Sequence, residues 1–218
     1  MNEQSDFASR RAWMVEDQIV GRGISSPLVI EAMRRVPREK FVTRSMMDCA
    51  YDDGPLPIGA GQTISQPYIV ALMADALDLK GGEVVLDIGT GSGYAAAVLA
   101  SIAARVFSIE RIPELADAAA KTLAAEGYDN VVVRCGDGTL GWPEQAPFDG
   151  ICVAAGAPVV PESLKQQLSI GGHLVIPVGS VHTVQSLRRI TRVSDTEFRS
   201  ENLGDVRFVP LLGEQGWS

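Results

Sequence analysis

The chain has 218 residues, a formal net charge of −8 at pH 7 and a hydrophobic fraction of 46%. That fraction is enough for a sizeable buried core and too high for an intrinsically disordered chain. The negative charge argues against nucleic-acid binding through a general basic face. No apolar run reaches the roughly 18 residues of a membrane-spanning helix, and the N-terminus lacks the apolar core of a signal peptide. We therefore expect a cytoplasmic protein that binds neither nucleic acid nor membrane. We also expect a monomer, although the sequence does not determine the oligomeric state.

Cysteine and histidine are scarce. Cys49, Cys135 and Cys152 lie far apart, and the histidines are His173 and His182. Scattered cysteines in odd number predict neither a disulfide framework nor a zinc site, so we expect reduced thiols and no metal. A lone histidine is more often structural than catalytic, which disfavours hydrolysis by a serine–histidine–acid triad.

Residues 1–64 predict a helical extension that ends in a substrate-side loop. Apolar residues recur at helical spacing over 5–23, and a capping serine followed by a proline starts a second helix over 26–37. Residues 37–63 have no regular pattern. Their most loop-like stretch is PLPIGAG at 55–61.

Strands and helices alternate from residue 65 onward. The predicted strands are 83–88, 105–110, 131–134, 148–154 and 172–178, the helices are 66–79, 93–104, 113–126 and 161–168, and further strands are expected over 183–192 and 197–212. This order predicts an α/β fold with a doubly wound, mostly parallel, Rossmann-like sheet, an N-terminal helical extension and C-terminal β-strands. Ligands of such sheets bind beyond the carboxyl ends of the strands.

A glycine-rich loop follows the first of these strands. VVLDIGTGSGY places Gly89, Gly91 and Gly93 between a strand and a helix. Glycine there permits a tight turn and lets a ligand approach bare backbone, although many α/β proteins use such a loop as a plain turn. The spacing G-x-G-x-G differs from the G-x-G-x-x-G that suits a dinucleotide pyrophosphate.

Three acidic residues follow three successive predicted strands. Asp87 precedes the glycines, Glu110 lies 23 residues later, where an acid typically binds ribose hydroxyls, and Asp137 is placed to accept a hydrogen bond from an adenine amino group. Taken singly, each acid fits a solvated strand end or a helix cap equally well. Together they suit an adenosine that carries a cation better than one that carries phosphates. The set favours S-adenosylmethionine over a nicotinamide dinucleotide.

LDIGTGSGY, SIE and GDG resemble the ordered motifs of class I methyltransferases. PLPIGAGQTISQPYIVALM (55–73) is similar to the signature of the protein-L-isoaspartate O-methyltransferase family, as are RVPREKFV (35–42) and VRFVPLLGEQGW (206–217). The resemblance covers nearly the whole chain from about residue 14. It implies a methyltransferase domain over 65–218, S-adenosylmethionine as cofactor and S-adenosylhomocysteine as product. The implied partners are age-damaged proteins and peptides, methylated on the free carboxylate of L-isoaspartyl residues and repaired through a succinimide.

Ser65 precedes Gln66-Pro67 at the N-terminus of a predicted helix. Free backbone N–H groups and the helix dipole attract an anion there, but a serine at this position more often caps its own helix. The resemblance reverses that preference, because Ser65 aligns with the serine regarded as the family's active-site residue. A carboxylate acceptor with a pKa of about 3.3–4.3 is already ionised at pH 7, so no strong general base is required.

The remaining site residues are implied by the resemblance. Asp87 is a second catalytic candidate beside Ser65. The implied cofactor-binding residues are Gln62, Thr63, Ile64, Ser65, Asp87, Gly89, Thr90, Gly91, Glu110, Arg111, Gly136, Asp137 and Gly138. The implied substrate-binding residues are Pro57, Ile58, Gly59, Ala155, Val206 and Phe208. Residues 206–211 would pair as a strand with the substrate peptide, although an ordinary edge strand fits the sequence equally well.

Other interpretations also fit parts of the sequence. A methyltransferase of the same fold could act on a small-molecule carboxylate, another metabolite or RNA, and a nucleotide-binding protein or a nicotinamide-dependent oxidoreductase could share the glycine loop. VAAGAPVVP (153–161) lacks the Asn/Asp-Pro-Pro-aromatic motif of base amino-group methylation. Gly156 interrupts an alanine run that the family commonly has and predicts a looser loop. Arg207 or Arg38 could form a local positive patch for an anionic substrate.

Overall fold

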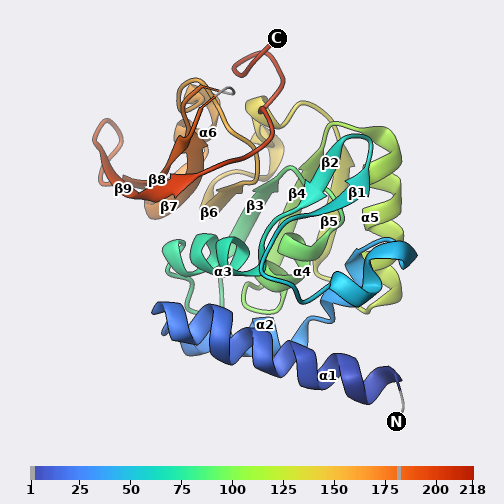
Figure 1. The fold of residues 1–218 in the computed structure, drawn as a ribbon. Helices are drawn as coiled ribbons and strands as arrows, with labels where there is room; N and C mark the ends of the chain where they lie inside the picture. Colours follow the sequence, from blue (N-terminus) through green and yellow to red (C-terminus); the bar gives the residue numbers. More distant parts are fainter. Residues whose placement is uncertain (1–2, 181–182) are drawn as a thin grey trace.

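A seven-stranded sheet forms the centre of the computed structural model, which describes residues 3–180 and 183–218 (Figure 1). Its strand order is β5-β4-β3-β6-β7-β8-β9. The strands are β3 (Val84–Ile88), β4 (Arg105–Glu110), β5 (Val131–Cys135), β6 (Phe148–Val153), β7 (Leu168–Val178), β8 (Gln185–Arg192) and β9 (Phe198–Val206). Neighbouring strands are parallel from β5 through β4, β3 and β6 to β7. Strands β8 and β9 extend the sheet in antiparallel pairing. The prediction of a mostly parallel α/β sheet with C-terminal strands is confirmed.

The strand order creates a switch point between β3 and β6. The chain winds from β3 outward through β4 and β5, and then returns to the other side of β3 as β6. The loops that leave β3 and β6 therefore diverge at the carboxyl edge of the sheet, where ligands bind in doubly wound folds. Gly89 follows β3 and Ala154 follows β6, and Ala154 N donates to Ile88 O over 2.8 Å.

Two hydrophobic cores lie on the two faces of the sheet. The helices are α3 (Pro67–Ala76), α4 (Tyr94–Ala100), α5 (Pro113–Ala125) and α6 (Glu162–Gln166). Because side chains alternate along a strand, Val85 and Val106 pack in the core that includes α3 and α4, whereas Leu86 and Phe107 pack in the core that includes Leu164 of α6.

The N-terminal helices share the first of these cores. Helix α1 (Glu3–Trp13) continues through a π-helical turn (Met14–Ile19) and a 3-10 turn (Val20–Arg22) to Gly23, whose φ is 95°. Helix α2 (Pro27–Arg35) is capped by the Ser26 hydroxyl, which accepts from Val29 N over 3.4 Å. Both helices lie beneath α3 and α4 in Figure 1. The two predicted N-terminal helices are confirmed.

The segment before Ser65 is more regular than the sequence predicts. After two 3-10 turns, Arg38–Phe41 and Arg44–Cys49, strands β1 (Leu56–Gly59) and β2 (Gln62–Ile64) form an antiparallel hairpin. The prediction of a loop at 55–61 is therefore wrong. Gly59, Ala60 and Gly61 all have positive φ and close the hairpin turn, and their turn-forming composition concealed the short strands on either side.

The predicted strand over 197–212 is wrong beyond Val206, where β9 ends. The amide of Gln185 replaces a neighbouring strand at the next residues. Its Oε1 accepts from Phe208 N over 2.8 Å, and its Nε2 donates to Phe208 O over 3.2 Å. The Gln185 side chain thus occupies the N–H and C=O groups of Phe208, which the sequence predicts to pair with a substrate peptide.

The end of the chain folds back over the carboxyl edge of the sheet. Leu211 N and Trp217 Nε1 both donate to Gly156 O, over 2.8 and 3.0 Å. Glu214 N donates to Asp137 Oδ2 over 2.8 Å. A Cβ at position 156 would collide with the Gln185 amide. The expected loosening at Gly156 is therefore wrong, because glycine allows a close and well-bonded contact there.

Candidate active site

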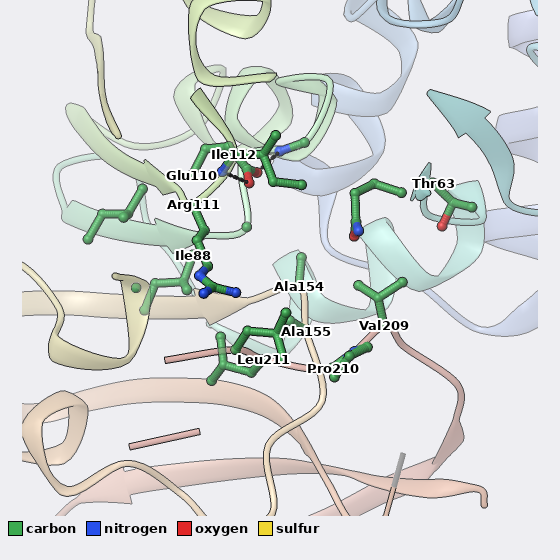
Figure 2. Close-up of a pocket in the computed structure, with 16 residues that line it drawn as sticks. Thr63, Ile88, Glu110, Arg111, Ile112, Ala154, Ala155, Val209, Pro210 and Leu211 are labelled. Atoms are coloured by element: carbon green, nitrogen blue, oxygen red, sulfur yellow. Dashed lines mark hydrogen bonds between the residues drawn. The ribbon is translucent and has the colours of Figure 1, made fainter. Parts of the chain in front are cut away.

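A pocket lies against the glycine loop at the switch point (Figure 2). We call it the glycine-loop pocket. Its lining residues are Gln62, Thr63, Ile88, Gly89, Gly91, Ile109, Glu110, Arg111, Ile112, Gly138, Ala154, Ala155, Val209, Pro210, Leu211 and Leu212. The space within it is about 670 Å³ when the open mouth is included.

Glu110 is the acidic group of the glycine-loop pocket. Its side chain is buried, its Oε2 accepts from Gly91 N over 2.8 Å, and its Oε1 accepts from Ile112 N over 3.0 Å (Figure 2). These backbone bonds fix the carboxylate in one orientation. A carboxylate has about four lone-pair sites, so two remain for the hydroxyl groups of a ligand.

Asp87 lies below the loop and does not line the pocket. It is fully buried, and its Oδ2 accepts from Ser108 Oγ over 2.6 Å, while Ser108 Oγ lies 2.6 Å from Thr90 Oγ1. Asp87 Oδ1 has no hydrogen-bond partner among the described residues. Burial and the charge of Glu110 raise the pKa of Asp87 to about 6, although the Ser108 bond opposes this. These three side chains connect Asp87 to the glycine loop, and the role of Ser108 is not predicted from the sequence.

Asp137 supports the far side of the pocket without lining it. Its Oδ1 accepts from the backbone N and the hydroxyl of Thr139, over 2.8 and 2.7 Å, and its Oδ2 holds Glu214 N. The adjacent Gly138 does line the pocket, and a Cβ there would collide with Ile88. Glycine at 138 therefore keeps the pocket wall close to the end of β3.

A second, wider pocket adjoins the first. We call it the Ser65 pocket. Its lining residues are Pro55, Thr63, Ser65, Gln66, Ile69, Ala154, Val184, Asp205, Val206, Arg207, Phe208, Val209 and Pro210. Four of these residues, Thr63, Ala154, Val209 and Pro210, also line the glycine-loop pocket. Figure 2 shows these four together on one side, with Glu110 on the opposite side. The two pockets thus share a wall.

The hydroxyl of Ser65 does not cap helix α3. The N-cap of α3 is Gln66, which makes no side-chain cap bond, and the Ser65 hydroxyl has no hydrogen-bond partner among residues 3–180 and 183–218. The capping interpretation is therefore wrong. Ser65 is half-buried, and its carbonyl accepts from Arg38 Nη2 over 2.8 Å.

A sequence model described as protein-L-isoaspartate(D-aspartate) O-methyltransferase matches residues 9–216 of the chain. The chain belongs to this family. It is 66% identical to protein-L-isoaspartate O-methyltransferase 2 of Marinobacter nauticus over 97% of both chains. It is 60% identical to protein-L-isoaspartate O-methyltransferase 1 of Rhodopseudomonas palustris, over 100% of this chain and 89% of that protein.

Solved structures of the isoaspartate methyltransferase family have the same fold. A structure named protein-L-isoaspartate O-methyltransferase has a TM-score of 0.86 and 30% identity, covering 96% of this chain and 67% of that one. A Plasmodium falciparum structure, described as a putative member of the family in complex with S-adenosyl-L-homocysteine, has a TM-score of 0.79 and 27% identity, covering 93% and 98%.

Against this family assignment, the structure distributes the predicted site residues as follows. Gln62, Thr63, Gly89, Gly91, Glu110, Arg111 and Gly138 line the glycine-loop pocket, together with Ala155, which was expected on the substrate side. Ser65, Val206 and Phe208 line the Ser65 pocket. Neither pocket is lined by Pro57, Ile58, Gly59, Ile64, Asp87, Thr90, Gly136 or Asp137. Ile64 and Thr90 instead border a small recess between Ser65 and the glycine loop.

Most of the wall that closes the glycine-loop pocket is not predicted from the sequence. Ile112 follows Glu110, and residues 209–212 cross the mouth. Residues 209–212 belong to the family motif VRFVPLLGEQGW, which predicts substrate pairing but not this contribution to the wall. The suggestion that Arg38 forms a surface patch is wrong, because Arg38 is fully buried. Arg207 is exposed and lines the Ser65 pocket.

The described part of the chain contains neither a metal-binding cluster nor a membrane-spanning helix. No group of three or more His, Cys, Asp or Glu residues there is placed to hold a metal ion, and no helix there is long and apolar enough to cross a membrane. His173 Nδ1 lies 3.0 Å from Thr191 Oγ1 on the neighbouring strand, which is a structural contact. His182 lies outside the described residues.

Proposed function

We propose that this chain transfers the methyl group of S-adenosylmethionine to the free carboxylate of L-isoaspartyl residues in damaged proteins and peptides, and so initiates their repair through a succinimide. The observation that carries the proposal is the wall shared by the two pockets. Thr63, Ala154, Val209 and Pro210 border both. A donor in one pocket and an acceptor in the other therefore meet at a single boundary.

The glycine-loop pocket fits S-adenosylmethionine. The unused lone pairs of Glu110 suit the two ribose hydroxyls. The apolar wall formed by Ile88, Ile112 and Leu211 suits the flat face of an adenine. When bound, the sulfonium supplies an electrophilic methyl group. We assign Gln62, Thr63, Gly89, Gly91, Glu110, Arg111 and Gly138 to direct contact with this cofactor.

The predicted cofactor residues outside the pocket receive supporting roles. Asp87 and Thr90 act through the hydrogen-bond chain with Ser108 that holds the glycine loop. Asp137 and Gly136 fix the turn that presents Gly138. The fully buried Asp87 is therefore a positioning residue in this proposal, and Ser65 is the only side chain to which we assign direct contact with the acceptor in catalysis.

The Ser65 pocket fits a carboxylate acceptor. The acceptor is ionised at pH 7, so its nucleophilic oxygen needs orientation and exclusion of water more than it needs a base. The unbonded hydroxyl of Ser65 is available to donate one hydrogen bond to it. Arg207, at the rim, adds a positive charge that attracts the anion. Val206 and Phe208 supply apolar contacts beside it.

Residues of one chain line both pockets, which supports a monomer as the acting form. The form that we propose is a monomer acting in the cytoplasm on isoaspartyl proteins, without nucleic acid or membrane. In this arrangement residues 1–64 contribute the substrate-side hairpin and the helical cover, and residues 65–218 contribute the methyltransferase domain.

The proposed activity is tested with methyl-labelled S-adenosylmethionine and two peptides that differ only in an isoaspartyl or aspartyl linkage. We expect label only in the isoaspartyl peptide, as a base-labile ester. Equal labelling of both peptides, or labelling of neither, would refute the proposed specificity. Ser65→Ala should lower kcat by about 100-fold, as loss of an oriented donor does, while the Kd for S-adenosylhomocysteine stays within about threefold. An unchanged kcat would remove Ser65 from the mechanism.

A further inference from the structure

Arg38 is a buried charge without a carboxylate partner among the described residues. Its side chain has no exposed surface, and burial lowers its pKa to about 10, so it remains protonated at pH 7. The neighbouring Glu39 is engaged elsewhere, by Arg11 and by the Tyr51 hydroxyl. A buried cation without a counter-ion is costly to keep, because desolvation is not repaid by an ion pair. Packing alone would be served better by an apolar side chain.

The guanidinium of Arg38 joins three segments around the site. Its Nε donates to Ala50 O over 2.7 Å, and its Nη2 donates to Ser65 O over 2.8 Å. Its Cζ lies 4.8 Å from the centre of the Tyr94 ring. Tyr94 is the first residue of α4 and directly follows the glycine loop. The Arg38 guanidinium therefore contacts both Ser65, which faces the acceptor in the proposed function, and Tyr94, which follows the glycine loop.

The Arg38 bond anchors the backbone of Ser65. It lies between β2 and α3, outside both elements, and its hydroxyl has no partner among the described residues. The bond from Arg38 holds its carbonyl on the buried side, which directs the rest of the residue toward the Ser65 pocket. Lysine lacks the planar fork that reaches two carbonyls and an aromatic face at once.

We propose that Arg38 is a positioning residue for methyl transfer: it fixes the backbone of Ser65 relative to the glycine loop, so that the Ser65 hydroxyl meets the acceptor carboxylate at the donor methyl. The proposal rests on the function proposed above for Ser65. Arg38 acts on turnover through Ser65 and makes no contact with either substrate.

A double-mutant cycle of Arg38→Gln and Ser65→Ala tests this inference. Kinetics with the isoaspartyl peptide give kcat, and calorimetry gives the Kd for S-adenosylhomocysteine. Arg38→Gln should lower kcat at least about 30-fold in the native background, since misplacing a reacting group costs up to about 100-fold. In the Ser65→Ala background the same change should lower kcat less than about threefold, because residues that act as a unit are not additive. The Kd should stay within about threefold in all four proteins.

Tyr51→Phe is the matched control. It breaks the buried bond to Glu39 in the same N-terminal layer and leaves both Arg38 bonds in place. We expect its kcat to stay within about twofold of the native value. If Arg38→Gln fails to bind S-adenosylhomocysteine, Arg38→Lys replaces it in the cycle, with an expected kcat loss of about five- to tenfold that also disappears in the Ser65→Ala background.

The outcomes separate the two proposals. Equal fold-losses from the Arg38 change in both backgrounds would overturn the positioning role, as would native kcat in the Arg38 variants or a kcat loss matched in Tyr51→Phe. Native kcat in Ser65→Ala alone would overturn the role of Ser65, and with it the route by which Arg38 acts. An inactive native protein would overturn the proposed function itself.

Discussion

The two pockets differ in how firmly their polar groups are held. At the glycine-loop pocket, Glu110 is buried and accepts two backbone N–H bonds. Asp137, which supports the far side, accepts two backbone N–H bonds and one bond from the Thr139 hydroxyl. In the Ser65 pocket, the Ser65 hydroxyl makes no bond to a described residue and Arg207 is exposed. A rigid site suits an invariant small molecule, whereas a site with exposed groups suits peptides whose flanking sequences vary. In the function that we propose, the chain thus combines a preformed donor site with an adaptable acceptor site.

Glu110→Ala should produce the largest loss of cofactor affinity and tests the rigid side of this comparison. It removes the acceptor for Gly91 N and Ile112 N as well as the partner for two ligand hydroxyls. We expect the Kd for S-adenosylhomocysteine to rise at least about 100-fold, equivalent to roughly 2.7 kcal/mol, measured by calorimetry. Glu114→Ala, on the first turn of α5, is the control and should leave the Kd unchanged. A Kd within threefold of native for Glu110→Ala would contradict the ribose assignment.

Asp87→Asn should weaken cofactor binding but raise the free energy of unfolding at neutral pH. The pKa of Asp87 is raised from 3.8 to about 6, so the folded state binds its proton more tightly than the unfolded state does. The resulting stabilisation is present below about pH 4 and is lost as the pH rises to 6. Asp87→Asn should therefore be more stable than native at pH 7.5 by up to about 3 kcal/mol, a difference that narrows toward pH 4.

Urea unfolding of Asp87→Asn at pH 7.5 and at pH 4.5 measures that difference, and the Kd for S-adenosylhomocysteine should rise in the same variant. A stability difference that is equal at the two pH values would show that Asp87 titrates normally in the folded chain.

Gly138→Ala should have a smaller effect on the glycine-loop pocket than Glu110→Ala or Asp87→Asn. The added Cβ meets Ile88 Cγ2 at the end of β3, and relief of that overlap costs about 1–3 kcal/mol. Unfolding in urea and the donor Kd report the effect together. Gly82→Ala, before β3, is the control, because no heavy atom lies within 4 Å of the added Cβ. Equal losses in the two variants would refute the role given to close packing.

Arg207→Gln should give the smallest effect and should sharpen the adaptable side of the comparison. Its charge is exposed, so we expect KM for an isoaspartyl peptide to rise only a few-fold at low salt, equivalent to about 0.5–1 kcal/mol, with kcat unchanged. The effect should shrink as salt is raised through about 0.15 M, because the Debye length falls to about 8 Å. A kcat loss without any salt dependence would place Arg207 in catalysis instead.

The sequence predicts the sheet well because its strands are short apolar runs separated by amphipathic helices. Arg105–Glu110 has the predicted bounds, and the fold-defining glycine loop lies where the motif indicates. The hairpin at 56–64 is missed because glycine and proline, which are read as loop formers, close its turn and occupy its first strand. Local composition does not distinguish an irregular loop from a short β-hairpin.

The candidate site is predicted less completely, because its remaining contacts join distant parts of the chain. Ser108 on β4 donates to Asp87 on the neighbouring strand β3. Residues 209–212 line the same pocket as Ile88 and Gly89, which lie more than one hundred positions earlier in the chain. Arg38 looks like a surface cation in the sequence, since nothing local reveals that Ala50, Ser65 and Tyr94 enclose it. Such contacts follow from topology and not from residue type.

Glu214 and Trp217 bind Asp137 and Gly156, and these bonds hold the last part of the chain against the glycine-loop pocket. The bonds that hold residues 211–217 are made to loops beyond β5 and β6 and not to the strands themselves. A substitution that broke them would therefore alter the wall of the glycine-loop pocket without removing any strand pairing of the sheet.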